Sequence, residues 1–465
     1  MNSIDSAILR DTICAIATPH GIGGIAVVRV SGPKSIAIAD TIWQGRSLAQ
    51  AKSHTAHFGL IVDPESGDTI DEAVATLFRA PASYTGDDTV EISVHGSRWI
   101  QRKLLQLLIN GGARMAEPGE YTRRAFASGR LDLAQAEAVA DLIAASSKEA
   151  HRIAMSQMKG AFSTRLGELR DKLLDLASLL ELELDFSEEE VEFASRRQLR
   201  ELSEEITAEL RRLTSSFAIG SAIKEGIPVA IVGETNSGKS TLLNRLLGEE
   251  RAIVSDIHGT TRDTIEDTTE IDGVMYRFID TAGLRDTVDP IEALGIDRAI
   301  DKAKRARIVL WIVDPTSSTL GDTAEKIRAA VGGDTPIITV VNKSDLGISG
   351  ATREAVASLM PDAVERIEIS ALNDCGLDAL RSALKRYSGT DSHEDILVTN
   401  ARHYEALTAA LTSIGRVTEG LDANLSGDFI AQDLRETIHH LSTITGTITT
   451  TDILSHIFSH FCIGK

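Results

Sequence analysis

Gly233-Glu-Thr-Asn-Ser-Gly-Lys239-Ser240 fits the phosphate-binding pattern G-x-x-x-x-G-K-[S/T], and it decides the fold of the middle of the chain. An apolar, strand-like run at 227–232 precedes it, and a helical run at 242–247 follows it. Glycines let successive backbone N–H groups point inward, so the loop and the helix N-terminus surround a phosphate. We therefore expect a P-loop, in which Lys239 neutralises the β- and γ-phosphates and the Ser240 hydroxyl binds Mg²⁺.

The identity of the nucleotide base is set further along the chain. Asn342-Lys-Ser-Asp345 follows a buried-strand run at 337–341. The Asp345 carboxylate can accept two hydrogen bonds from the N1–H and amino groups of guanine. Adenine has no such pair of donors, so the motif favours GTP over ATP. Ser370-Ala371 follows another strand-like run and is expected to close the same site, although this pair is also common in ordinary loops.

Two stretches between these motifs are typical of nucleotide switches. Asp280-Thr-Ala-Gly283 follows a strand-like run, and Gly259-Thr-Thr261 lies in a polar loop. Asp280 is expected to hold Mg²⁺ through water, and the Gly283 amide to contact the γ-phosphate. Thr261 is expected to complete the metal shell.

The position after the second switch lacks a catalytic group. Signalling GTPases place Gln there to orient the attacking water, whereas this chain has Leu284. Without that Gln or an arginine finger, intrinsic hydrolysis is expected to be slow. Spacing alone does not choose among the nearby charged side chains, which are Arg285, Asp286, Asp289 and Glu292.

The composition is that of an ordinary soluble globular protein with several domains: 465 residues, 42% hydrophobic and 25% charged. A net charge of −20 excludes a broadly basic surface, so any RNA contact must use local patches or a partner. The three cysteines are widely separated, no apolar run approaches 18 residues, and no basic-then-apolar leader is evident at the N-terminus. These features predict a cytoplasmic protein without a membrane span.

The pattern of apolar and polar residues changes three times along the chain, which predicts a multidomain α/β and α+β protein. Residues 1–128 alternate strand-like runs with Gly/Pro turns and one helix, which indicates an N-terminal α+β domain. Residues 129–220 and 390–465 are helical, with apolar stripes that need a partner. The economical arrangement is one central helical domain built from these two segments, with a doubly wound α/β P-loop GTPase domain inserted at 221–389.

Four stretches resemble the MnmE (also TrmE) family of tRNA wobble-uridine modification GTPases, and the resemblance covers essentially the whole chain. They are the opening at 11–32, Pro118-Gly-Glu-Tyr-Thr-Arg-Arg-Ala-Phe126, Leu131-Asp-Leu-Ala-Gln-Ala-Glu137 and Phe458-Ser-His-Phe-Cys-Ile-Gly-Lys465.

The resemblance implies an N-terminal domain that forms a homodimer and binds 5-formyl- or methylene-tetrahydrofolate, and a GTPase activated by K⁺ and by dimerisation of its G domains. It implies a heterotetramer with the FAD-dependent protein MnmG. Such complexes install aminomethyl or carboxymethylaminomethyl groups at carbon 5 of the wobble uridine in certain tRNAs, using methylene-tetrahydrofolate and glycine or ammonium.

The resemblance also assigns residues by motif position. Asn236 would bind K⁺ with Ser255, Ile257 and Thr260, and the cation would stand where other GTPases have an arginine finger. Glu292 matches the family's catalytic glutamate, which orients the attacking water through a bridging water. The expected GTP contacts, from the motifs and the resemblance together, are Asn236, Ser237, Gly238, Lys239, Ser240, Thr241, Ser255, Asp256, Ile257, His258, Gly259, Thr260, Thr261, Asp280, Thr281, Ala282, Gly283, Asn342, Lys343, Asp345, Ser370, Ala371 and Leu372.

The positions that match the family's folate contacts are Arg29, Glu91, Arg130 and Lys465. Arg29 and Lys465 would pair with glutamyl carboxylates, and Glu91 would accept hydrogen bonds from the pterin. Arg130 stands where lysine is familiar, which keeps the charge and changes its geometry. Cys462 either takes part in the chemistry or only lines the folate pocket.

Two readings from other classes remain open. An RNA- or ribosome-associated assembly GTPase would bind without modifying anything, but it would carry a basic RNA-binding module that this acidic chain lacks. A folate-dependent aminomethyl transferase could use nucleotide binding only for regulation, and it is distinguished by whether turnover needs GTP hydrolysis or binding alone.

Overall fold

The computed structural model describes residues 11–185, 196–248, 267–279, 303–317, 320–390, 396–423, 425–459, 461–462 and 464. The chain divides into two compact units. The first contains Met1–Ala140, Gln157–Ser203 and Ser413–Lys465, and the second contains Asp141–Ser156 and Glu204–Thr412. Among the helices in the described ranges, none combines the length and hydropathy that crossing a bilayer requires.

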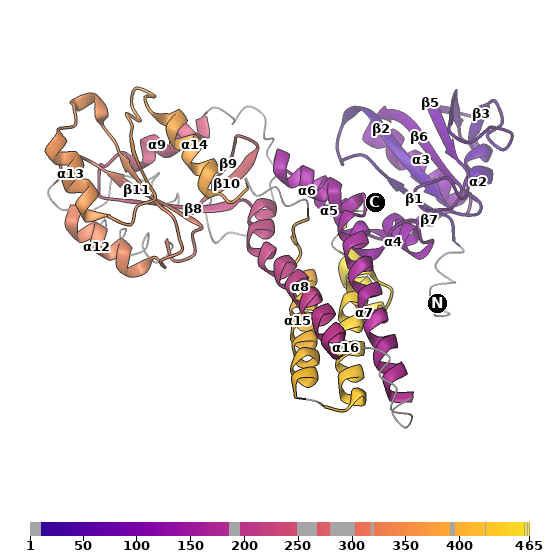
Figure 1. The fold of residues 1–465 in the computed structure, drawn as a ribbon. Helices are drawn as coiled ribbons and strands as arrows, with labels where there is room; N and C mark the ends of the chain where they lie inside the picture. The colour runs from indigo at the N-terminus through magenta and orange to yellow at the C-terminus, as the bar shows by residue number, and fades with distance from the viewer. Residues whose placement is uncertain are drawn as a thin grey trace. The chain divides into compact units, whose positions relative to one another are not determined.

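The first unit contains a seven-stranded sheet in the order β3-β4-β5-β6-β2-β1-β7 (Figure 1). All of its neighbouring strands pair antiparallel except β1 and β7. The strands are β1 (Ile13–Ile16), β2 (Gly23–Ser31), β3 (Trp43–Gly45), β4 (Thr55–Val62), β5 (Thr69–Phe78), β6 (Thr89–Gly96) and β7 (Arg114–Met115).

Alternating side chains of these strands bury one face of the sheet, as the period-2 pattern predicts. Val28 and Val30 of β2 are fully buried and pack in one core with residues of α2 (Ser35–Thr41) and α3 (Arg98–Asn110). Ser97 caps α3, because its side chain accepts a hydrogen bond from Trp99 N. Strands and helices follow one another irregularly, which confirms the predicted α+β class for this part of the chain.

The remaining helices of the first unit form a bundle from two distant stretches of sequence. α7 (Ala161–Asp185) packs along α16 (Gly427–Thr445), and Figure 1 shows them side by side. Leu169 and Leu173 of α7 and Leu434 of α16 are buried, so the apolar stripes expected from the sequence do face a partner. Further helices with residues in this unit are α4 (Glu120–Ala127), α5 (Leu133–Ala144), α6 (Lys148–Met158), α8 (Arg196–Glu225), α15 (Ala401–Asp422) and α17 (Thr451–Ser459).

A buried ion cluster fixes α4 against the sheet. The side chains of Glu120 and Arg124 are both fully buried and lie 2.9 Å apart. Arg114, on β7, donates to both Glu120 carboxylate oxygens, at 2.7 and 2.8 Å. Burial by itself would raise the pKa of Glu120, but the hydrogen bonds from Arg114 and the Glu117 amide outweigh it and lower that pKa to about 2.

Removing this carboxylate is expected to destabilise the first unit strongly. Glu120→Ala removes the carboxylate that lies 2.9 Å from the buried Arg124 and leaves the more distant Asp87 carboxylate, 3.7 Å away, which we expect to cost about 3–5 kcal/mol. The measurement is urea unfolding followed by fluorescence in a Trp311→Phe background, so that Trp43 and Trp99 of this unit report. Glu117→Ala is the matched control, since the Glu117 side chain is largely exposed and its ion pair is with Arg123 at 3.0 Å, and we expect it to cost less than about 1 kcal/mol.

The same carboxylate makes stability depend on pH. Its pKa is lower in the folded state than in the unfolded chain, so its contribution is complete above about pH 5 and is lost as the pH falls toward 2. The difference between wild type and Glu120→Ala should therefore shrink between these values. A difference that stays constant down to pH 2 would contradict the assignment.

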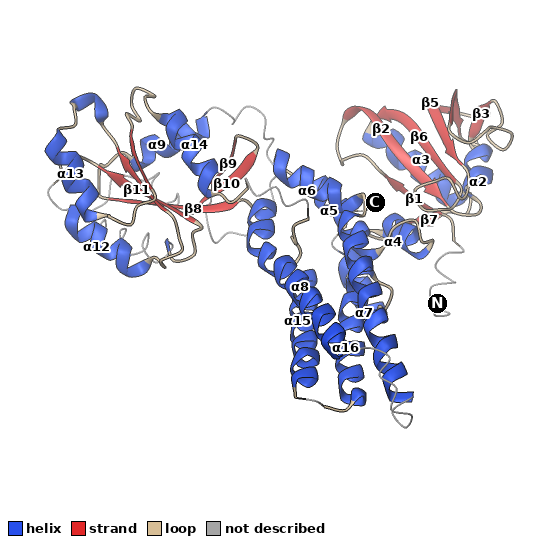
Figure 2. Ribbon diagram, viewed as in Figure 1, coloured by secondary structure: helices blue, strands red, loops and turns tan. Residues whose placement is uncertain are grey.

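The second unit contains a six-stranded sheet in the order β13-β12-β11-β8-β10-β9, parallel except for β9 (Figure 2). β8, β11 and β12 are almost continuously apolar, as expected for strands covered on both faces. The strands are β8 (Ile227–Gly233), β9 (Asp267–Ile271), β10 (Val274–Ile279), β11 (Ile308–Val313), β12 (Ile337–Val341) and β13 (Glu365–Glu368).

Helices cover both faces of this sheet. Leu242 of α9 (Lys239–Gly248) and Leu380 of α14 (Leu377–Tyr387) belong to one core cluster. Ile327 of α12 (Leu320–Ala330) and Val356 of α13 (Gly350–Leu359) belong to the other. This is the doubly wound α/β architecture that the sequence predicts. The chain leaves α8 (Arg196–Glu225) to enter β8, and it enters α15 (Ala401–Asp422) after α14, so this sheet is inserted between helical segments.

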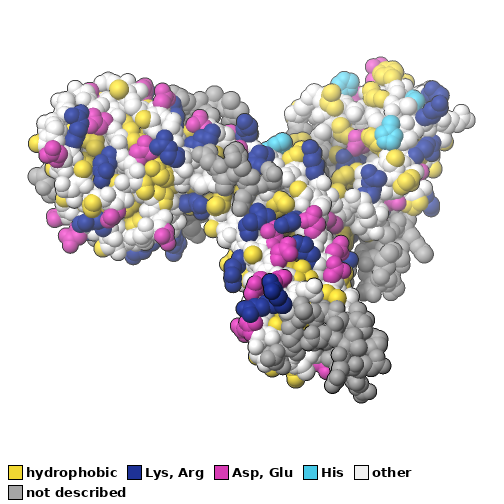
Figure 3. Space-filling view, in the orientation of Figure 1, with side chains coloured by type: hydrophobic (Ala, Val, Ile, Leu, Met, Phe, Trp, Pro, Cys, Tyr) yellow, Lys and Arg dark blue, Asp and Glu magenta, His cyan; other side chains and the backbone are white. Residues whose placement is uncertain are grey.

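Figure 3 shows one face of the molecule, on which basic and acidic side chains alternate instead of gathering into a single basic surface. This agrees with the formal net charge of −20. Any contact of this face with a polyanion would therefore be local.

Candidate functional site

The P-loop joins the carboxyl end of β8 to the start of α9. Gly238 within it has φ +95°, and a Cβ added there would lie 2.0 Å from Asn342 Nδ2. No side chain fits at that distance, so glycine is required for the loop to approach the neighbouring motif. α9 then begins at Lys239, with its first N–H groups at the loop.

The Lys239 side chain hydrogen-bonds to the backbone of the P-loop. Its Nζ donates to the carbonyl oxygens of Gly233 and Glu234, at 2.9 and 2.6 Å. The ammonium group is therefore held where the loop opens at the carboxyl edge of the sheet. A phosphate bound there would meet a positive charge together with the backbone donors of the helix N-terminus.

Asn342 ties three separate loops together at this edge. It is buried, and its Nδ2 donates to Ser237 O at 2.8 Å while its Oδ1 accepts from Ala371 N at 3.0 Å. The Ser370 hydroxyl donates to Asp345 Oδ1 at 2.6 Å. The P-loop, the Asn-Lys-Ser-Asp motif and the Ser-Ala pair, which span more than a hundred residues of sequence, thus form one continuous polar site. Their individual contacts with GTP stay predictions.

Replacing Asn342 is expected to loosen this site without removing any side chain expected to contact phosphate. Asn342→Ala leaves the buried Ser237 carbonyl and Ala371 amide without their partner, and we expect GTP affinity to fall by about 10- to 100-fold. Equilibrium titration with a fluorescent GDP analogue measures it. Asn373→Ala, an exposed asparagine on the adjacent loop, is the control and should bind normally. Equal affinities for the two variants would show that the bridge does not support nucleotide binding.

Two acidic residues that sequence reasoning missed stabilise the same edge. Asp314 follows β11 directly and forms an ion pair with Lys343 Nζ at 2.5 Å. Burial raises the pKa of Asp314, but hydrogen bonds from Lys343 and Thr316 outweigh it, and the net shift is downward. Glu234 in the P-loop accepts a hydrogen bond from Ser317 Oγ. The sequence could have indicated Asp314 as a site residue, because it follows a buried strand that runs parallel to β8. Nothing in the sequence indicates a role for the Glu234 side chain.

A second group of predicted residues meets in the first unit. Arg29 and Glu91 face each other across β2 and β6, and Arg29 Nε and Nη2 lie 2.9 and 2.8 Å from Glu91 Oε1. The Arg29 side chain is only 15% exposed. Its guanidinium lies 5.7 and 5.4 Å from the ring centres of Tyr84 and Tyr121, within cation–π range.

The segment around Gly464 reaches this group. Arg29 Nη1 donates to Gly464 O at 3.4 Å, and the Cys462 carbonyl accepts from Gly119 N at 3.4 Å. Gly464 has φ +102°, and an added Cβ would lie 2.3 Å from Ile16 O, so the segment lies directly on the end of β1. The Cys462 thiol itself is exposed.

This second group fits a folate in its chemistry. It offers a cation for a carboxylate, an acceptor for pterin N–H groups, and aromatic rings beside the cation. Arg130, the other described candidate, donates to Pro81 O at 2.9 Å, in the loop that carries Tyr84. Within the described ranges, no three His, Cys, Asp or Glu side chains lie together as in a metal centre.

The remaining predicted site residues lie outside the described residues. They are Ser255, Asp256, Ile257, His258, Gly259, Thr260, Thr261, Asp280, Thr281, Ala282, Gly283, Glu292 and Lys465.

Comparison with known proteins places this chain among close relatives. A family profile described as "MnmE helical domain" matches residues 133–462, and one described as "GTP-binding protein TrmE N-terminus" matches residues 12–130. A Bacteroides fragilis protein named tRNA modification GTPase MnmE is 53% identical over 468 residues, covering 98% of this chain and 100% of the relative. Proteins of the same name from Parabacteroides distasonis and Flavobacterium johnsoniae are 52% and 47% identical, covering 98% of this chain and 100% and 99% of the relatives.

Solved structures of GTP-binding proteins are similar to part of this chain. A GTP-binding protein from Sulfolobus solfataricus in complex with GDP is 22% identical and covers 47% of this chain and 66% of its own, with a TM-score of 0.28. The G domain of the T. maritima FeoB iron transporter is 20% identical and covers 35% of this chain and 98% of its own, with a TM-score of 0.26.

Proposed function

Because the chain belongs to the MnmE family of tRNA modification GTPases, we propose that it couples GTP hydrolysis to a folate-dependent modification of tRNA. The modification is the addition of an aminomethyl or carboxymethylaminomethyl group at carbon 5 of the wobble uridine. The observation that carries this proposal is the contact of Arg29 with both Glu91 and Gly464, because it assembles a folate-compatible site in a chain that also holds a complete P-loop.

In the nucleotide site, each described residue has a chemical task. Lys239 neutralises the β- and γ-phosphates, and Ser240, the second residue of α9, provides its hydroxyl to Mg²⁺. Asp345 selects guanine, with its carboxylate held by Ser370. Mg²⁺ offsets the charge of the transferring phosphoryl group when it is bound, and Asp280 and Thr261 would complete its shell.

Hydrolysis uses a cation in place of an arginine finger. Asn236 would provide one ligand for K⁺, and its backbone has the left-handed conformation, φ +59°. Ser255, Ile257 and Thr260 would supply the other ligands, and Glu292 would orient the attacking water through a second water. Supporting this assignment, the position after Gly283 is Leu284, which cannot orient water itself.

In the first unit, Arg29 and Lys465 bind the glutamyl carboxylates of 5-formyl- or methylene-tetrahydrofolate, Glu91 accepts from the pterin, and Arg130 adds a further cation. The bound folate supplies the one-carbon unit. Cys462 lies two residues before Gly464, and its carbonyl oxygen accepts a hydrogen bond from Gly119 N. This hydrogen bond fixes the backbone of the residue that carries the exposed thiol.

The partners follow from this function. We propose that two copies of the chain dimerise and that the dimer assembles with the FAD-dependent MnmG protein as a heterotetramer, which acts on tRNA in the cytoplasm. GTP hydrolysis would drive opening and closure around the modification centre.

The cation requirement gives a direct test. GTP hydrolysis in KCl is expected to be at least about tenfold faster than in NaCl, because a desolvated K⁺ at Asn236 offsets the charge that develops on the phosphates. Asn236→Ala should abolish the difference and leave only the slow rate. The matched control is Asn244→Ala, which removes an exposed asparagine from α9 and should keep full stimulation. Equal rates in both salts for the wild type would remove the finger-free mechanism and favour a simple binding switch.

A further inference from the structure

The second unit has a pocket at the edge of the sheet opposite the P-loop. Its volume is about 570 Å³, and it lies where β8, β11 and β12 begin. We call it the basal pocket. Since β8 has seven residues, the basal pocket and the P-loop are roughly 20 Å apart along the strands. Its charged or aromatic lining side chains are Glu225, Arg277, Arg305, Arg307, Asp334 and Tyr387.

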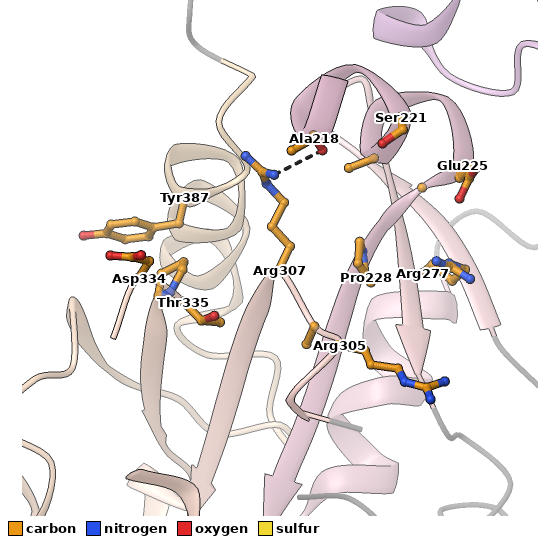
Figure 4. Close-up of a pocket in the computed structure, with 14 residues that line it drawn as sticks. Ala218, Ser221, Glu225, Pro228, Arg277, Arg305, Arg307, Asp334, Thr335 and Tyr387 are labelled. Atoms are coloured by element: carbon orange, nitrogen blue, oxygen red, sulfur yellow. Dashed lines mark hydrogen bonds between the residues drawn. The ribbon is translucent and has the colours of Figure 1, made fainter. Parts of the chain in front are cut away.

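Basic and acidic side chains both line the basal pocket, and Glu225 lies on the same side as Arg277 (Figure 4). Arg307 crosses its middle toward α8, with Tyr387 and Asp334 on one side and Arg277 and Arg305 on the other. Three guanidinium groups and two carboxylates therefore line one small volume, so its lining carries a formal charge of +1 in a protein that is strongly acidic overall. This concentration of positive charge is local, as the composition requires of any anion-binding site.

Arg307 is a half-buried cation whose hydrogen-bond partners in the described part of the chain are backbone carbonyl oxygens. Its Nη1 donates to Ala218 O at 3.2 Å and its Nε to Ser388 O at 3.3 Å. Within the described ranges, no carboxylate lies within 4.0 Å of its guanidinium. Burial lowers the pKa of Arg307, which means that the protein opposes its charge here. An anion in the basal pocket would offset that cost.

Arginine geometry indicates which anion. A guanidinium has five N–H donors in a planar fork, and the two recorded bonds leave further donors of Arg307 for a ligand. Arg305 is exposed, and among the described residues it forms no ion pair. Forks of this kind bind the oxygens of phosphate groups in pairs.

We propose that the basal pocket binds a small phosphate-bearing molecule, with Arg305 and Arg307 donating to its phosphate oxygens. The volume lies within the range of small-molecule sites, roughly 300–1,000 Å³, which favours a compact ligand over a polymer. Tyr387 and Asp334 offer a ring and an acceptor to the part of the ligand that carries no phosphate. Because this pocket and the P-loop lie at opposite edges of one sheet, the ligand binds together with GTP and does not compete with it.

The test uses the full-length protein saturated with Mg²⁺ and a non-hydrolysable GTP analogue, so that every phosphate position at the P-loop is filled. Calorimetric titration with pyrophosphate and with inorganic phosphate is expected to show one additional site. Arg305→Ala and Arg307→Lys should each weaken binding about tenfold or more, because each removes charge-assisted hydrogen bonds. Arg98→Ala, which removes an exposed arginine from the first unit, is the matched control and should bind like the wild type.

Two further measurements distinguish a loss of binding from a loss of folding, and a small phosphate ligand from RNA. Arg305 is exposed and its replacement is not expected to change the melting temperature, so its variant keeps the test valid even if Arg307→Lys is unstable. Titration with tRNA is the second arm. The proposal is overturned if neither phosphate probe binds, if both arginine variants bind as tightly as wild type, or if the substitutions weaken only tRNA, in which case the basal pocket is an RNA contact.

Discussion

Replacing Lys239 by alanine is expected to lower kcat/KM for GTP by at least about 10³-fold. In the structure the Lys239 ammonium group spans the mouth of the P-loop, bonded to Gly233 O and Glu234 O. With nucleotide bound, it is the cation nearest to the charge that spreads over the transferring phosphoryl oxygens. Preorganised positive charge of this kind lowers the activation free energy by several kcal/mol, and a water molecule in its place would not do so.

The measurement is steady-state GTP hydrolysis in KCl, with the phosphate release rate followed over a range of GTP concentrations. Lys385→Ala is the control, since it removes the same charge from α14 and has no assigned task. A binding titration with a GDP analogue separates the loss of chemistry from the loss of affinity. Activity within tenfold of the wild type would mean that the P-loop is not the hydrolytic site.

Replacing Asp345 by asparagine is expected to reduce GTP affinity by roughly 10³-fold or more, because the guanine N1–H and amino groups lose their common acceptor and face an amide N–H. Ser370 holds one Asp345 oxygen at 2.6 Å, so the carboxylate is fixed before the base arrives. The exchange should also favour xanthosine triphosphate, whose C2 carbonyl can accept from the new amide.

Competition between the two nucleotides measures this change in preference. Asp378→Asn is the matched control: it makes the same chemical change at an exposed residue of α14 that forms an ion pair with Arg381 at 3.1 Å. Recovery of hydrolysis with xanthosine triphosphate would show that the substituted site is intact. Unchanged GTP affinity would show that Asp345 does not read the base.

The nucleotide-binding architecture was predictable because its signals are local. The P-loop pattern, the apolar strands and the turns between them each occupy fewer than about ten residues, and together they specify a parallel sheet with helices on both faces. The helical stripes were equally visible, and Leu169 and Leu173 are buried as expected. The domain boundaries at 128, 220 and 389, and the roles of individual site residues, stay predictions.

Features that depend on distant pairs were not predictable. Lys343 pairs with Asp314 between two neighbouring strands, and Glu234 pairs with Ser317. Asp314 is marked by its place at the end of a buried strand, but the sequence does not show which residue it pairs with. Glu120 and Arg124 look like an ordinary surface pair four residues apart on a helix, yet both are fully buried. Arg29 and Glu91 were named from the resemblance alone, and only the register of β2 with β6 makes them neighbours.

The pairing of α7 with α16 has a consequence for how the protein is made. More than 200 residues separate the two helices, and Phe458 and Phe461 pack against Leu133 more than 300 residues after it in sequence. Contacts of such long range form late, because the intervening chain must first be closed into a loop. During synthesis on a ribosome, the six-stranded sheet can fold as one contiguous stretch of sequence. The first unit cannot complete its fold at that stage, because α16 and α17 have not yet been synthesised.

A chain interrupted before α16 would then display a folded nucleotide-binding unit beside exposed leucines of α7. Such an intermediate could already bind GTP, and it would be the species that chaperones meet during synthesis.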